Sequence, residues 1–191
     1  MNISREHLEL LSENFRNIDE TTKEIINLEA ILSLPKGTEH FLSDIHGEYE
    51  AFDHILRNGS GVIKEKLKEV FGNRLPKKEL NLLATIIYYP EEKLNLLKKE
   101  FSTAEYKEYQ KILLLRLLEV TQVAARKYTR SKVRKLLPKD FDYIIEELLY
   151  KMQTRDKEDY YEKILENIIE LGAGDKFIIE LSLSIHKLLI D

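Results

Sequence analysis

One segment of this chain departs from a helical pattern, residues 40–52, which read His40-Phe41-Leu42-Ser43-Asp44-Ile45-His46-Gly47-Glu48-Tyr49-Glu50-Ala51-Phe52. Its first four residues, 40–43, form a short and largely apolar run that follows a turn at Gly37. Such a run is typical of a buried strand. From Glu48 onward the apolar residues return to helical spacing. The segment therefore predicts one β-strand that runs directly into a helix, and we expect no other strand.

The remainder of the chain is predicted to be helical. Gly and Pro together supply eleven of the 191 residues, about half of their usual share of roughly 12%, and a turn-rich all-β architecture needs more of both. Apolar residues at spacings of three and four predict helices over 4–18, 21–32, 48–57, 62–71, 76–88, 90–100, 102 towards 138, 141–152, 159–171 and 176–190. We expect Ser4 and Asp175 to cap the first and last of these, and capping boxes at Thr21–Glu24 and Ser102–Glu105 to open two others.

A single strand among so many helices does not make a complete sheet. Its backbone amides and carbonyls would be unpaired at both edges, and unpaired buried backbone groups are costly. Either the strand prediction is wrong, or the strand belongs to a sheet whose other members lie outside these 191 residues.

Composition and charge exclude several classes of protein. Hydrophobic residues make up 43% of the chain and charged residues 34%, which is too apolar for a disordered chain and too charged for a membrane-spanning one. A net charge of −4 and a pI near 5.8 give the chain as a whole no basic surface for nucleic acid or for anionic lipid. Because there is no Cys, disulfides, thiolate catalysis and Cys-based zinc sites are excluded, and we expect a cytoplasmic protein.

The predicted strand ends in the sequence D-x-H-G, formed by Asp44, Ile45, His46 and Gly47. Strand residues two apart share one face, with backbones about 6.6 Å apart, so the carboxylate and the imidazole could converge on one divalent cation. Gly47 permits a sharp turn, and the free amides that open the following helix would attract a phosphate group. A metal beside a phosphate is the arrangement for phosphoester hydrolysis. The alternative interpretation is that Asp44 caps the helix and His46 is an ordinary turn residue.

Residues 40–52, continued by Leu56-Arg57-Asn58-Gly59-Ser60-Gly61, closely resemble the N-terminal region of bacterial class 3 fructose-1,6-bisphosphatases. These enzymes are calcineurin-like metallophosphoesterases, whose first motif is G-D-x-H-G, and here Ser43 replaces the leading Gly. The resemblance implies that Asp44 and His46 are ligands of one ion of a two-metal site that usually holds manganese. It also implies hydrolysis of fructose 1,6-bisphosphate, a sugar bisphosphate, to fructose 6-phosphate, a step of gluconeogenesis.

The later motifs of that family, G-D-x-x-D-R and G-N-H-D, do not occur in this sequence. We therefore expect a mainly α chain that holds one strand of an incomplete α/β metallophosphoesterase sandwich and that is inactive by itself. Residues 1–61 would comprise the N-terminal helices, the first strand and the following helix, and residues 62–191 a large helical insertion. Uncovered strand edges and apolar helix faces favour self-association, so a homo-oligomer is a further expectation.

Two other interpretations stay open. A helical interaction or scaffold protein without catalysis would leave Asp44 and His46 structural, and another calcineurin-like phosphoesterase would share the D-x-H-G motif with a different substrate.

Six cations also fall within ten residues, at Arg126, Lys127, Arg130, Lys132, Arg134 and Lys135. They could bind a phosphorylated substrate, a nucleotide effector or RNA, but a solvated helix face is the simpler interpretation.

Overall fold

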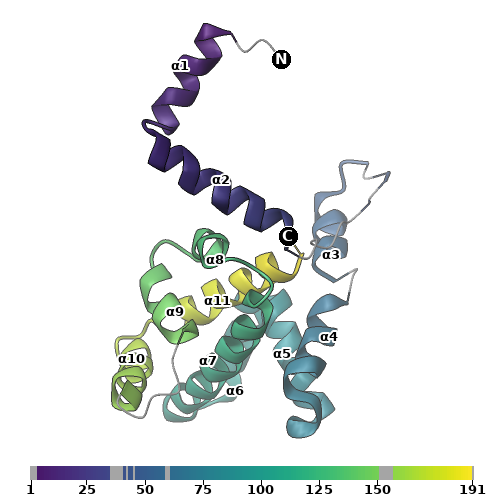
Figure 1. Ribbon diagram of the computed structural model, residues 1–191. Coiled ribbons are helices and arrows are strands. Elements are labelled where there is room, and N and C mark those ends of the chain that lie inside the picture. The colour runs from purple at the N-terminus through teal and green to yellow at the C-terminus, as the bar shows by residue number, and fades with distance from the viewer. Residues whose placement is uncertain are drawn as a thin grey trace. The chain divides into compact units, whose positions relative to one another are not determined.

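The computed structural model describes residues 4–34, 41, 43–44, 46–58, 61–150 and 157–190 (Figure 1). These residues form eleven α-helices and one short 3-10 helix, and none of them belongs to a strand. The predicted mainly α character is confirmed. The chain divides into two compact units, Met1–Lys36 and Gly37–Asp191.

The predicted strand lies only partly within the described residues. His40 and Leu42 fall outside them, whereas Phe41 and Ser43 are described and are not in a strand. A strand is defined by the backbone partner with which it pairs, and the described parts of the chain offer no such partner. The strand therefore stays a prediction that depends on residues beyond this chain.

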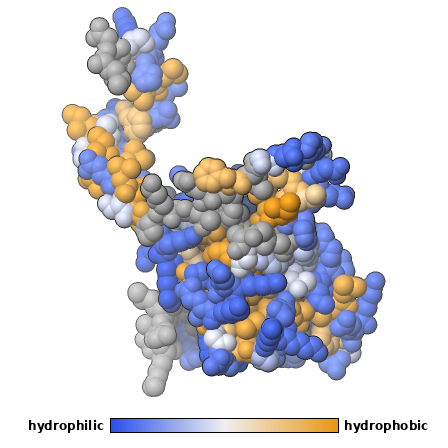
Figure 2. Space-filling model, turned by 90° about the vertical axis from the view of Figure 1, so that its right-hand side faces the viewer, coloured by the Kyte–Doolittle hydropathy of each residue, from blue (hydrophilic) through white to orange (hydrophobic). Residues whose placement is uncertain are grey.

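The first unit consists of two helices, α1 (Arg5–Asn14) and α2 (Ile18–Leu32). As predicted, the Ser4 side chain caps α1, with Oγ accepting a hydrogen bond from the His7 amide at 3.3 Å. No residue of either helix is buried, and apolar side chains remain at the surface of both (Figure 2).

The predicted capping box at Thr21 is wrong. The Asn17 side chain caps α2 instead, because its oxygen accepts a hydrogen bond from the Glu20 amide at 2.8 Å. Thr21 therefore lies inside the first turn, where its hydroxyl donates to the Asn17 carbonyl at 3.0 Å. Asn is as strong an N-cap as Ser or Asp, and it starts the helix one turn earlier than the Thr-Glu pattern indicated.

The second unit contains the other helices: α3 (Tyr49–Asn58), α4 (Val62–Phe71), η1 (Gly72–Arg74), α5 (Lys77–Tyr88), α6 (Pro90–Glu100), α7 (Thr103–Ala125), α8 (Arg130–Leu136), α9 (Asp142–Leu149), α10 (Glu158–Glu170) and α11 (Gly174–Ile190). Most of these bounds agree with the predicted ranges to within one or two residues. The predicted capping box of Ser102 and Glu105 is confirmed, with both of its reciprocal hydrogen bonds present.

The long helix predicted from Ser102 towards Pro138 is in fact two helices. α7 ends at Ala125, and α8 begins after Thr129, whose side chain accepts a hydrogen bond from the Lys132 amide at 3.2 Å. No Gly or Pro marks this break, so the apolar pattern alone did not reveal it. A Thr side chain that bonds to the local backbone ends one helix and starts the next.

The core of the second unit is built around its last helix. Phe177, Ile178, Leu181, Ile185 and Leu188 of α11 are fully buried. α11 runs beside α7 (Figure 1) and also contacts α4, α5, α6, α8 and α10. A helix that is apolar around most of its circumference is stable only when other helices surround it, so α11 occupies the centre.

Asp175 does not cap α11 as predicted. The helix begins at Gly174, so Asp175 lies in its first turn. Its Oδ1 accepts hydrogen bonds from Tyr106 Oη and Gln110 Nε2, both at 2.7 Å, and its Oδ2 pairs with Lys98. Burial, and then the bond to Asp175, raise the pKa of Tyr106 well above its usual value, so the phenol stays a donor. These contacts attach α6 and α7 to the start of α11.

Among the described residues, no helix is both long enough and apolar enough to cross a bilayer.

We expect Leu181→Ala to lower the free energy of unfolding by about 2–5 kcal/mol, because it leaves a cavity in the middle of the core. Leu171→Ala is the matched control, since Leu171 is 83% exposed, and it should change stability by no more than about 0.5 kcal/mol. Urea unfolding followed by circular dichroism at 222 nm measures both. Equal effects of the two variants would contradict a central position for α11.

A second prediction concerns the close approach of α7 to the start of α11. A Cβ at Gly174 would lie 2.7 Å from Gln110 Nε2 and 2.9 Å from its Cδ, so Gly174→Ala must displace Gln110 and break its bond to Asp175. In a Gln110→Ala background this obstacle is gone. The double-mutant cycle should therefore give a coupling of about 1 kcal/mol. Additive effects in urea unfolding would show that Gln110 does not restrict this position.

Candidate metal site

Asp44 and His46 lie in an exposed loop just before α3. His46 Nε2 is 2.5 Å from Asp44 Oδ1, and the two side chains are 72% and 75% exposed, respectively. The structure thus brings together the two residues that the sequence singled out. A carboxylate oxygen and an imidazole nitrogen are available to solvent at the same point.

The backbone brings them together in a different way from the one predicted. Asp44 has φ 65°, His46 has φ 51° and Gly47 has φ 75°, all in the left-handed region rather than in the extended region of a strand. For Asp and His this conformation is uncommon and costs on the order of 1 kcal/mol or more each. Such residues concentrate at functional sites, which favours a functional role for the loop over an arbitrary turn.

The loop joins α3 through a tight turn. The Tyr49 amide donates to the Gly47 carbonyl at 3.0 Å, and the Phe52 amide donates to the Glu48 carbonyl at 2.9 Å. The role expected for Gly47 as the turn residue is confirmed. Since the first helical hydrogen bond starts at Glu48, Asp44 lies too early to be the N-cap of α3, and the interpretation of Asp44 as a helix cap is wrong.

The two donors fit part of a metal site. Carboxylate oxygen and imidazole nitrogen are ordinary ligands of divalent first-row metals. Within the described residues, however, no group of three or more His, Asp or Glu side chains is arranged to hold an ion. The described residues therefore offer two candidate donors at this point, and a complete coordination sphere would need further ones.

His54, on α3, makes a contact that its position in the sequence did not indicate. Its Nδ1 lies 2.5 Å from Tyr89 Oη, and the two rings stack with centroids 6.2 Å apart. Tyr89 stands at the junction of α5 and α6. The contact joins the helix behind the loop to the helical core.

The run of cations at 126–135 is only partly a solvated helix face. Arg134 donates two hydrogen bonds to Glu146, at 3.0 and 2.7 Å, which raises the pKa of the guanidinium and lowers that of the carboxyl. The Arg130 guanidinium lies over the Tyr150 ring, 4.8 Å from its centroid. Sequence spacing gave no signal for either partner, because each lies more than ten residues away along the chain.

Comparison with known proteins gives a consistent result. The family model described as Firmicute fructose-1,6-bisphosphatase matches residues 6–191. The chain is 58% identical over 186 residues to "Fructose-1,6-bisphosphatase class 3" of Alkaliphilus metalliredigens (strain QYMF), covering 97% of this chain and 28% of that protein. It is 53% identical over 190 residues to the protein of the same name from Listeria monocytogenes serotype 4b (strain CLIP80459), covering 99% and 29%. No solved structure matches.

The chain thus spans less than a third of the length of these relatives. The same proportion holds for the class 3 protein of Clostridioides difficile (strain 630), which is 50% identical over 192 residues, with 100% of this chain and 29% of that protein covered.

We expect the 191-residue chain to bind Mn²⁺ weakly, with a dissociation constant on the order of 1 mM, because two ligands hold an ion poorly. His46→Ala should abolish this binding, whereas His54→Ala, which removes the imidazole that contacts Tyr89, should not. The amplitude of the free Mn²⁺ signal in electron paramagnetic resonance measures both. Micromolar binding that survives His46→Ala would place the ion elsewhere.

Proposed function

Because the chain belongs to the class 3 fructose-1,6-bisphosphatase family, we propose that it is part of a metal-dependent phosphatase that hydrolyses fructose 1,6-bisphosphate to fructose 6-phosphate and phosphate. This reaction is a step of gluconeogenesis. The observation that carries the proposal is the match over residues 6–191, and the adjacency of Asp44 and His46 in the D-x-H-G motif supports it.

Asp44 and His46 are the proposed ligands of one metal ion, and manganese is the proposed metal. Divalent ions in such a site generate hydroxide, polarise the phosphoryl group and stabilise the leaving oxygen. Asp44 supplies negative charge, and His46 supplies a neutral nitrogen donor at the same point. Gly47 turns the chain so that the first amides of α3 face an incoming phosphate group, which helix N-termini favour.

The organisation of the chain follows the same proposal. Residues 40–43 would form the first strand of the catalytic sheet, and the other strands and ligands would come from the two thirds of the family's length that this chain does not span. Residues 1–61 would then belong to the catalytic part and residues 62–191 to a helical insertion. If the chain divides in this way, the conformation of the loop at Asp44 would depend on contacts with the rest of the catalytic part and not with the helical insertion.

The proposal predicts that the 191-residue chain has negligible phosphatase activity and that a polypeptide of the family's full length gains it with Mn²⁺. Release of inorganic phosphate from fructose 1,6-bisphosphate, measured with and without the metal, is the test. Robust turnover by the 191-residue chain would show that the donor set is complete without further residues. If the full-length polypeptide hydrolyses a different phosphoester but not fructose 1,6-bisphosphate, the proposed substrate is wrong.

Substitutions in the full-length polypeptide test the ligands themselves. Asp44→Ala and His46→Ala should each lower kcat/KM by about 100-fold or more, since a lost ligand removes or misplaces the ion, and the helical circular dichroism should stay unchanged. His7→Ala, which removes an exposed imidazole on α1, is the control and should retain full activity. Near-wild-type rates for His46→Ala would remove His46 from the site.

A further inference from the structure

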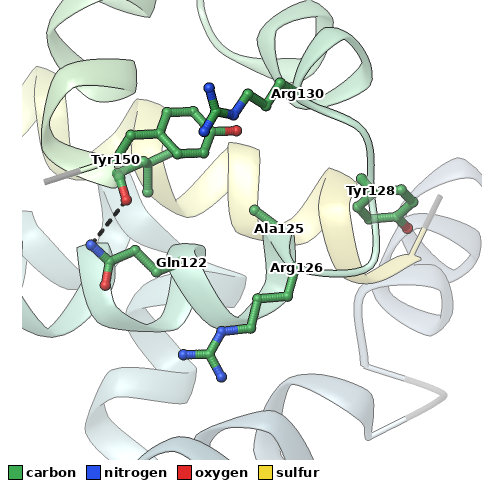
Figure 3. A pocket seen from close by; sticks show the side chains of 7 residues that line it. Gln122, Ala125, Arg126, Tyr128, Arg130 and Tyr150 are labelled. Atoms are coloured by element: carbon green, nitrogen blue, oxygen red, sulfur yellow. Dashed lines mark hydrogen bonds between the residues drawn. The ribbon is translucent and has the colours of Figure 1, made fainter. Parts of the chain in front are cut away.

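A cavity of about 420 Å³ lies where α7 ends, α8 begins and α9 ends (Figure 3). Its volume is within the range of roughly 300–1,000 Å³ that is typical of small-molecule sites. Ala125 and Leu149 contribute apolar surface. The polar part of the lining comes from Gln122, Arg126, Tyr128, Arg130 and Tyr150.

Two arginines lie on different sides of this cavity. Figure 3 shows Arg130 beside the Tyr150 ring on one side and Arg126 on the other side of Gln122. Stacking on Tyr150 holds the Arg130 guanidinium in place, 4.8 Å from the ring centroid, and leaves its N–H edge available to a ligand. Both guanidiniums are exposed and permanently charged. Each can therefore bind one anionic group.

Gln122, which also lines the cavity, provides a hydrogen-bond acceptor there. Its Nε2 donates to the backbone carbonyls of Leu148 and Leu149, at 3.3 and 3.1 Å. Two carbonyl acceptors can be satisfied only by the amide nitrogen, so they fix the orientation of the side chain. Its Oε1 has no hydrogen bond within the described parts of the chain, and it can accept one from a ligand hydroxyl.

The surroundings of the cavity are positive although the chain as a whole is acidic. Lys127 and Lys132 lie 5.0 and 4.6 Å from the centroid of the Tyr128 ring. The carboxylate of Glu146 is held by two hydrogen bonds from Arg134. An anion would thus enter a region whose field favours it.

We propose that this cavity binds a small hydroxyl-bearing molecule that carries an anionic group such as phosphate at each end. Arg130 binds one end, Arg126 binds the other, and Gln122 Oε1 accepts a hydrogen bond from a hydroxyl between them. In Figure 1, α8 and α9 lie on one side of α11 and α3, which follows the candidate metal loop, lies on the other. The cavity is therefore a site separate from the loop, and it does not depend on the proposed phosphatase function.

The test is isothermal titration of the 191-residue chain, in EDTA to exclude metal, with three probes: mannitol 1,6-bisphosphate, mannitol 1-phosphate and inorganic phosphate. The bisphosphate should bind about tenfold more tightly than either of the others, since only it has one phosphate group for each arginine. Arg126→Gln and Arg130→Gln should each weaken its binding about tenfold. Lys135→Gln, which removes one charge from the same helix as Arg130 but does not line the cavity, is the matched control and should leave the affinity within about twofold.

Any one of four results would overturn the proposal. If Lys135→Gln weakens binding as much as Arg130→Gln, or if inorganic phosphate binds as tightly as the bisphosphate, the anion responds only to overall surface charge. If a single-stranded RNA binds more tightly than the bisphosphate, the surface is a nucleic-acid site. Asp44→Ala must leave bisphosphate binding unchanged, because a loss would place the ligand at the metal loop. Failure of the cavity and failure of the phosphatase proposal are therefore distinguishable.

Discussion

The packing of α11 against α7 determines the arrangement of the helical part of the molecule. Buried side chains such as Phe177, Ile178 and Leu181 lie around most of the circumference of α11, so other helices must surround it to keep these side chains from water. Burial of each such side chain contributes roughly 1.5–3 kcal/mol, which no surface ion pair of the chain can match. Since α11 contacts α4, α5, α6, α7, α8 and α10, this core closes only when α11 packs against the helices that precede it in the chain.

The candidate metal loop stands in a different physical situation. Asp44 and His46 are largely exposed and contact each other, and both have left-handed backbone. Behind the loop, on α3, His54 contacts Tyr89. This contact attaches the helix behind the loop to the helical core.

The candidate metal loop and the cavity lined by Arg126 and Arg130 would attract anions in different ways. At the loop, a carboxylate and an imidazole can attract a phosphate only through a metal ion and the amides at the start of α3. At the cavity, permanent charges on Arg126 and Arg130 attract an anion directly. A chain with a net charge of −4 can hold both because charge acts locally in salt solution, over about 8–10 Å.

The sequence by itself determined the helical class, most helix bounds, the capping box at Ser102 and the pair of residues at the D-x-H-G motif. These depend on local spacing and on local hydrogen bonds, which residues a few positions apart decide. It failed at Asn17, at the break before Thr129 and at Asp175, where one side chain's bond outweighed the apolar pattern. Only the tertiary structure decided that Asp175 holds Tyr106 and Gln110, that Arg130 stacks on Tyr150 and that α11 is central, because those partners lie far apart in the chain and meet only when the apolar faces pack.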